Sequence, residues 1–95
     1  MPTDDRQAAA AKIAELIALL KESGPGTAGL VDECEALARA IAAFHMEGIR
    51  FRIYDVDRLV HQGSGVPADA PALLEAARRH LEAAGFHTRS HQAPS

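Results

Sequence analysis

The stretch Gly48-Ile49-Arg50-Phe51-Arg52-Ile53-Tyr54 alternates apolar and polar side chains with a period of two. This alternation is typical of a half-buried β-strand, because successive side chains of a strand point to opposite faces of the sheet. We therefore expect a strand over residues 48–54. Its residues Ile49, Phe51 and Ile53 would face a core, and the two arginines and the tyrosine would face outward.

A helix is the alternative for this segment. Ile49, Ile53, Val56 and Val60 recur at helical spacing, so residues 49–60 also fit an amphipathic helix, and the fold would then be an all-α bundle. We favour the strand because β-branched and aromatic side chains occupy alternate positions of the segment.

Upstream of this stretch the pattern is helical. A first helix is expected from residue 4 to residue 21 or 22, with Asp4 at the N-cap and Gln7 completing a capping box. A second helix begins after Thr27, and the short Gly24-Pro25-Gly26 connection makes the two helices an antiparallel hairpin. Apolar residues spaced as in two heptads form the stripe of the second helix: Leu30, Cys34, Leu37, Ile41 and Phe44.

Downstream, a loop over residues 63–67 precedes a third helix over residues 70–84, with Asp69 as its N-cap. Residues 86–90 are expected to form a second short strand, paired with the first through a right-handed crossover or across a dimer axis. The sequence thus predicts one α+β domain over residues 1–95, an antiparallel helical hairpin followed by a strand-helix-strand end, with residues 91–95 as a flexible tail.

Composition points to self-association. Hydrophobic residues make up 47% of the chain, but many are alanine, aromatic residues make up only 4%, and there is no tryptophan. A core built from such small side chains buries little area, and a second copy of the chain would complete it. We therefore expect a homodimer in which the stripe of the second helix supplies the interface through Leu30, Leu37, Ile41 and Phe44.

Charge and cysteine content narrow the class of protein. The net charge of −3 argues against binding to nucleic acid or to an anionic membrane, and no apolar run approaches the length of a membrane span. The N-terminal residues carry no secretory signal pattern, and Cys34 is the only cysteine, so no disulfide forms within the chain. These features predict a cytoplasmic protein in which Cys34 is a small core residue.

Histidines are concentrated in the second half of the chain, which contains four of the five. His87 and His91 are spaced to share one face of a regular element, and His80 lies at the end of the helix before them. Neutral imidazole suits zinc, nickel, copper or iron, so these three residues are the candidate ligands of a transition metal.

Asp55 and Asp57 follow an apolar run, and paired carboxylates can hold Mg²⁺, but we expect the two side chains to cap a helical turn or to lie in solvent and predict no catalytic residue. The pair resembles the start of haloacid-dehalogenase-type phosphatase motifs. Those motifs continue with Thr or Val, whereas Arg58 follows here, and the chain is too short for the doubly wound domain of such enzymes.

Taken together, these features predict a small non-enzymatic interaction or assembly module acting as a homodimer. The alternative is a small-ligand or transition-metal sensor.

Overall fold

The computed structural model describes residues 4–63 and 65–86, and these residues fold into four α-helices with no strand among them. Their bounds are Asp5–Glu22 for α1, Ala28–Ala42 for α2, Met46–Gln62 for α3 and Ala70–Ala83 for α4, with a 3-10 turn, η1, at Pro25–Thr27. None of the helices in this part of the chain is long and apolar enough to cross a membrane.

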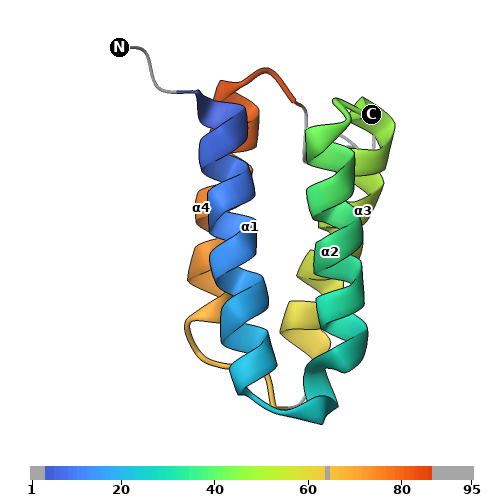
Figure 1. Ribbon diagram of the computed structural model, residues 1–95, viewed down its shortest axis with the longest axis vertical. Coiled ribbons are helices and arrows are strands. Elements are labelled where there is room, and N and C mark those ends of the chain that lie inside the picture. The colour runs from blue at the N-terminus through green and yellow to red at the C-terminus, as the bar shows by residue number, and fades with distance from the viewer. Residues whose placement is uncertain (1–3, 64, 87–95) are drawn as a thin grey trace.

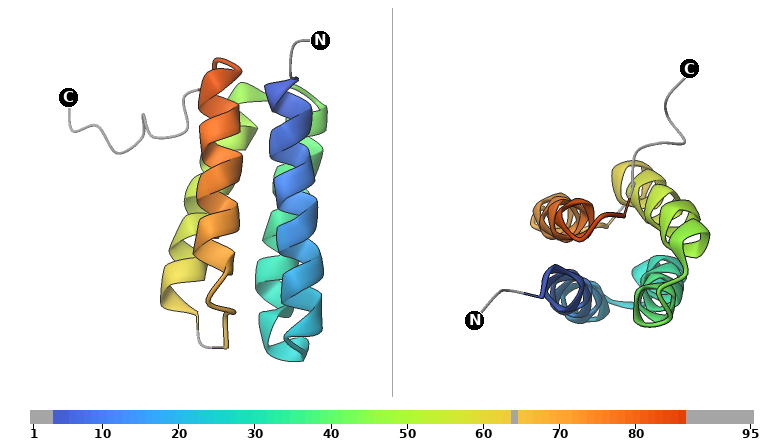
Figure 2. Two further views of the ribbon diagram at one scale, coloured as in Figure 1. Left: turned by 90° about the vertical axis from the view of Figure 1, so that its left-hand side faces the viewer. Right: turned by 90° about the horizontal axis from the view of Figure 1, so that it is seen from above.

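The helices form a four-helix bundle in which successive helices run in opposite directions, with α1 and α2 in one layer and α4 and α3 in the other (Figure 1). α1 packs against both α2 and α4, and α3 packs mainly against α2. Viewed along the helices, α3 occupies the corner diagonal to α1 (Figure 2). One side of α3 therefore faces the core, and the opposite side faces solvent.

The first two helices begin where their capping residues predict. The Asp4 carboxylate accepts hydrogen bonds from the backbone N–H groups of Arg6 and Gln7 at 3.0 and 3.1 Å, so Asp4 is the N-cap of α1 as expected. Thr27 is the N-cap of α2, but its hydroxyl donates to the Leu20 carbonyl at 2.7 Å instead of capping the helix. This bond ties the α1–α2 connection to the end of α1 and stabilises the predicted hairpin.

The predicted strand over residues 48–54 is wrong, and with it the α+β assignment, because these residues belong to α3 and the described chain is all-α. Four side chains of α3 enter the core, namely Ile49, Ile53, Val56 and Val60. Phe51, which the strand would bury, is 60% exposed. The segment is helical because a period of 3.6 residues buries four β-branched side chains on one face. Two of them, Val56 and Val60, lie beyond the residues that the strand pattern covers. Of the second predicted strand only Phe86 is described, and it lies in irregular structure after α4.

A sharp turn separates α2 from α3. The N–H groups of Phe44 and His45 donate to the Ile41 and Ala40 carbonyls at 3.2 and 3.1 Å, which is the hydrogen-bond pattern of a Schellman helix end. This pattern requires a left-handed backbone at Phe44, whose φ is +57°. His45 then caps α3, since its Nδ1 accepts from the Gly48 N–H at 2.9 Å. A Cβ at position 48 would lie 2.5 Å from that nitrogen, so the cap needs glycine there.

The two interpretations of residues 48–54 differ in the cost of truncating their side chains. In dilute solution Ile53→Ala should lower the free energy of unfolding by about 2–5 kcal/mol, since it empties a fully buried site. Phe51→Ala should cost about 0.5 kcal/mol or less, because its ring lies on the surface. Urea unfolding of both variants measures the difference, and equal losses would contradict the helical orientation of α3.

Candidate functional site

The predicted interface on α2 is largely internal to the chain. Leu37 and Ile41 are fully buried and Leu30 nearly so, all within the core of the single bundle. Of the four predicted interface residues, only Phe44 is exposed. The heptad stripe of α2 therefore packs against the other helices of the same chain.

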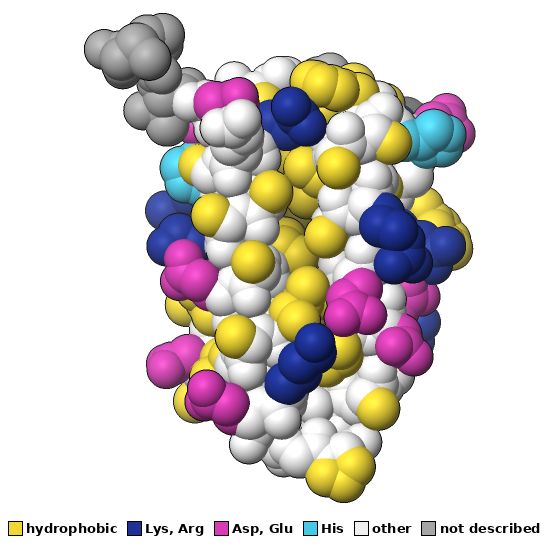
Figure 3. Space-filling model, viewed as in Figure 1, with side chains coloured by type: hydrophobic (Ala, Val, Ile, Leu, Met, Phe, Trp, Pro, Cys, Tyr) yellow, Lys and Arg dark blue, Asp and Glu magenta, His cyan; other side chains and the backbone are white. Residues whose placement is uncertain are grey.

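Large exposed hydrophobic side chains are confined to one region of the described surface, residues 44–54, where they are Phe44, Met46, Phe51 and Tyr54. The face formed by α1 and α2 is different: hydrophobic side chains lie along the line between the two helices, with charged side chains beside them (Figure 3). None of the large exposed hydrophobic side chains lies on α1 or α2. An ion pair of 3.6 Å between Lys21 and Glu35 links the two helices on this face. The best candidate for a contact surface is therefore α3 and the turn before it.

The outer face of α3 carries a regular row of side chains. Glu47, Phe51, Tyr54 and Arg58 are spaced four, three and four residues apart, which is the spacing of a coiled-coil seam. They lie on the side of the helix opposite its buried stripe, and all four are exposed. We call these four residues the α3 seam. A shallow hollow of about 480 Å³ lies between three of the seam residues and Arg50; its lining is Glu47, Arg50, Phe51 and Tyr54.

Two ion pairs hold side chains in or beside the seam: one joins α3 to α2, and the other lies within α3. Arg52 donates to both carboxylate oxygens of Glu33 on α2, at 2.7 and 3.2 Å, and its guanidinium lies 5.3 Å from the centre of the Phe51 ring. Arg58 donates to Asp55 at 2.7 Å, and this bond lowers the pKa of the Asp55 carboxyl below its ordinary value. Arg58 is therefore held at one end of the seam by an ionised carboxylate.

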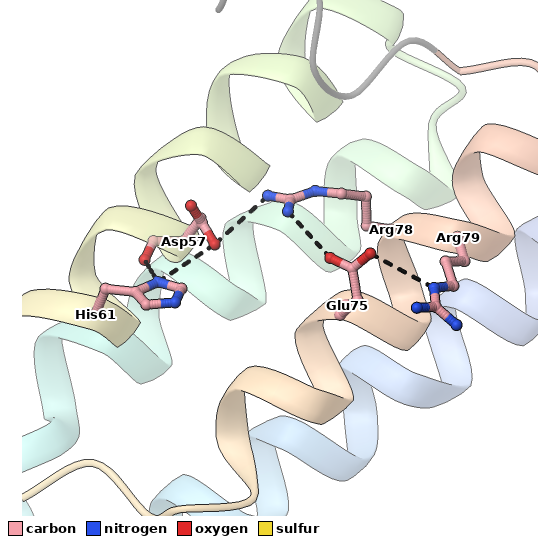
Figure 4. A network of polar contacts seen from close by, with 5 residues as sticks. All are labelled: Asp57, His61, Glu75, Arg78 and Arg79. Atoms are coloured by element: carbon pink, nitrogen blue, oxygen red, sulfur yellow. Dashed lines mark hydrogen bonds and ion pairs between the residues drawn. The ribbon is translucent and has the colours of Figure 1, made fainter.

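A second polar network links α3 to α4 (Figure 4). Arg78 of α4 lies almost buried, with Nη2 3.5 Å from the Asp57 carboxylate of α3 and Nη1 donating to Glu75 at 3.2 Å. His61 approaches Asp57 from its own helix, with its Nδ1 2.8 Å from the backbone carbonyl oxygen. The Nε and Nη2 atoms of Arg78 are buried without a hydrogen-bond partner. Both edges of α3 are thus attached to neighbouring helices by arginine–carboxylate contacts.

A separate aromatic cluster lies at the end of the bundle where α1 begins and α4 ends. The Arg6 guanidinium stands 3.9 Å from the centre of the Phe44 ring, and the Phe86 ring stacks at 6.3 Å from it. Arg6 also donates to the Ile41 carbonyl at 3.3 Å. These contacts hold the left-handed Phe44 in place, so this cluster has a clear structural role in ending α2.

The predicted metal ligands are not brought together in the part of the chain that the structure describes. His80 contacts Asp5 of α1, with Nδ1 2.9 Å from Oδ1, while His87 and His91 lie outside the described residues. Among residues 4–63 and 65–86, no three histidine, cysteine or acidic side chains are placed to hold a metal ion. The structure gives His80 a different partner, a carboxylate that joins α4 to α1.

The two carboxylates and the cysteine singled out in the sequence are engaged by arginines or buried. Asp55 and Asp57 are two residues apart on a helix and so point in different directions, one to Arg58 and the other toward Arg78. Cys34 is fully buried, as expected, and burial followed by the nearby charges of Glu33 and Glu35 raises the pKa of its thiol to about 12. A thiol of this kind is protonated at neutral pH and is a poor nucleophile.

The sequence interpretation missed the α3 seam because it assigned Phe51 to a core. The signal was present in the 4-3-4 spacing of Glu47, Phe51, Tyr54 and Arg58, which has meaning only if the segment is helical. Comparisons with models of protein families, with curated proteins and with solved structures gave no match. Function must therefore be inferred from the geometry of this chain.

The contact between α3 and α4 predicts a specific pattern of stability changes. Asp57→Asn should lower the free energy of unfolding by about 1 kcal/mol, because it leaves the buried Arg78 cation with less compensation. Arg78→Met should be close to neutral or stabilising, since it removes buried donors that lack partners. In the Arg78→Met background Asp57→Asn should lose most of its cost. Urea unfolding of the four proteins in this double-mutant cycle measures the coupling.

The buried thiol predicts slow chemical labelling and a dependence on alkaline pH. Cys34 should react with a disulfide reagent at pH 8 only after unfolding. Because the folded protein favours the protonated thiol, the resulting stability is complete below the ordinary pKa of 9.0 and is lost as the pH rises toward about 12. The stability of the wild type relative to Cys34→Ala should therefore fall over this range, and an unchanged difference would contradict the assignment.

Proposed function

We propose that the chain is a non-enzymatic protein-interaction module whose contact surface is the α3 seam. The observation that carries this proposal is the exposure of Phe51 and Tyr54, 60% and 43% respectively, one turn apart in a chain with only four aromatic residues. Aromatic and arginine side chains dominate the binding energy of protein interfaces. Two of these few rings therefore lie next to each other on the surface, which favours a role in binding.

The charged residues around the rings support the same proposal. Glu47 and Arg58 stand at the two ends of the seam, and Arg50 lines the hollow beside it. An apolar centre with a polar margin is the usual arrangement of a protein–protein contact, in which the margin contributes specificity more than affinity.

The rigidity of the seam also favours binding. α3 is fixed on one side by Arg52 and Glu33 and on the other by Asp57 and Arg78. A surface held in one conformation before binding loses less entropy when a partner arrives.

Two further expectations belong to the same proposal. The single cysteine favours a cytoplasmic location. The contacts of Asp55 and Asp57 with arginine side chains favour a role without catalysis.

Photocrosslinking from the seam tests this function. A benzophenone amino acid replaces Phe51 in the full chain, and in a matched control it replaces Ala14, an exposed residue of α1. Irradiation in cells that produce the protein should give a discrete protein adduct from position 51 and none from position 14. The masses of the adducts are read by electrophoresis and mass spectrometry.

Both possible adducts at position 51 support an interaction role, whether the partner is another copy of this chain or a different protein. Two results would contradict the proposal: no adduct from position 51, or the same adducts from positions 51 and 14.

A further inference from the structure

Resting on the proposed function of the α3 seam, we infer that the partner it binds is a second copy of this chain, with the two α3 helices antiparallel about a two-fold axis. The order of side chains along the seam carries this inference. From the start of α3 the order is acidic, aromatic, aromatic and basic: Glu47, Phe51, Tyr54 and Arg58. A seam with opposite charges at its ends and rings at its centre is complementary to its own reverse.

The spacing makes the match quantitative. Glu47 and Arg58 each lie 5.5 residues from the midpoint between Arg52 and Ile53, and Phe51 and Tyr54 each lie 1.5 residues from it. A two-fold axis through that midpoint therefore places Glu47 opposite Arg58 of the second copy at both ends. It also places Phe51 opposite Tyr54 of the second copy on both sides of the axis. With a rise of 1.5 Å per residue, the two ionic contacts stand about 16 Å apart along the helix, with four rings between them.

A parallel pairing has the opposite electrostatics. It would place Glu47 against Glu47 and Arg58 against Arg58, and like charges facing each other are unfavourable. The antiparallel pairing is closed and isologous, since each contact occurs twice and no seam residue remains to recruit a third copy. Charge complementarity thus selects both the partner and its direction.

The surroundings of the seam permit this contact. α3 stands at a corner of the bundle, so its outer face projects away from α1 (Figure 2). Arg58 is already oriented by its 2.7 Å bond to Asp55, and Arg52 of the same chain, bound to Glu33, stands beside the Phe51 ring. The side chains that would meet the second copy are therefore positioned before association.

The contact is small, and we expect it to be weak and reversible. Four aromatic side chains, each burying about 150–250 Å² when fully enclosed, contribute less than the area of a standard stable interface. The dimer should therefore form at micromolar or higher concentrations and exchange rapidly with monomer.

A charge-exchange experiment tests the pairing. Glu47→Arg gives a seam with arginine at both ends, and Arg58→Glu gives a seam with glutamate at both ends. Each variant alone should dimerise about 10-fold or more weakly than the wild type, because both ionic contacts become repulsive. An equimolar mixture should form a heterodimer, since every arginine then faces a glutamate. Sedimentation velocity measures the wild type, the two variants and their mixture, and circular dichroism verifies that each variant is folded.

The ion pair of Lys12 and Glu15 on the surface of α1, away from the α3 seam, supplies the control, since Lys12→Glu and Glu15→Lys should leave dimerisation unchanged. Three results would overturn the inference: a wild type that stays monomeric up to about 1 mM, seam variants that dimerise like the wild type, or a mixture no more dimeric than its components. If the wild type is monomeric while position 51 still crosslinks to a different protein, this inference fails and the proposed function stands.

Discussion

Burial of Ile49, Ile53, Val56 and Val60 fixes the rotation of α3 about its own axis. Each of these side chains contributes about 1.5–3 kcal/mol when removed from water, so a rotation that buried Phe51 in their place would lose several such terms. With this orientation set, the residues opposite the stripe must face solvent. The exposed rings, the charged ends of the α3 seam and the antiparallel pairing that we infer all follow from the same burial.

Polar contacts on both edges of α3 complement this apolar constraint. The pair formed by Arg52 and Glu33 is partly exposed and adds little net stability. Arg78 is more costly, because two of its nitrogens are buried without a hydrogen-bond partner, and its compensation comes from Glu75 at 3.2 Å and from Asp57 at 3.5 Å. These contacts matter chiefly for position, since they attach α3 to α2 on one side and to α4 on the other while leaving its outer face clear.

The helices whose ends are marked by capping, glycine or proline residues could be predicted from the sequence, whereas α3 was only the alternative to a strand. Asp4, the Gly-Pro-Gly connection and Asp69 mark the starts of α1, α2 and α4 to within about a residue, whereas Phe44, expected on the second helix, lies beyond the end of α2 at Ala42. At the end of α2 the left-handed residue is Phe44 instead of the usual glycine, so the start of α3 carried no signal. Ile49 and Ile53 fit both the period of two of a strand and the period of 3.6 of a helix. Only the later apolar residues, Val56 and Val60, distinguish the helix from the strand. Once α3 is helical, α1 and α3 of the same chain cover the α2 stripe, which is why three of the four residues predicted as an interface, Leu30, Leu37 and Ile41, lie in the core.

The most direct measurement of the central claim is a distance between identical sites of two chains. A spin label at Gln62, the exposed last residue of α3, reports the direction of pairing. In the antiparallel arrangement the two copies of position 62 are separated by a rise of 19 residues along the helix axis. Double electron–electron resonance in concentrated solution should therefore give a distance of about 30 Å between the two labels. A separation of about 15 Å or less would indicate parallel helices, and the absence of any interchain distance would indicate that α3 does not pair with itself; either result would contradict the account.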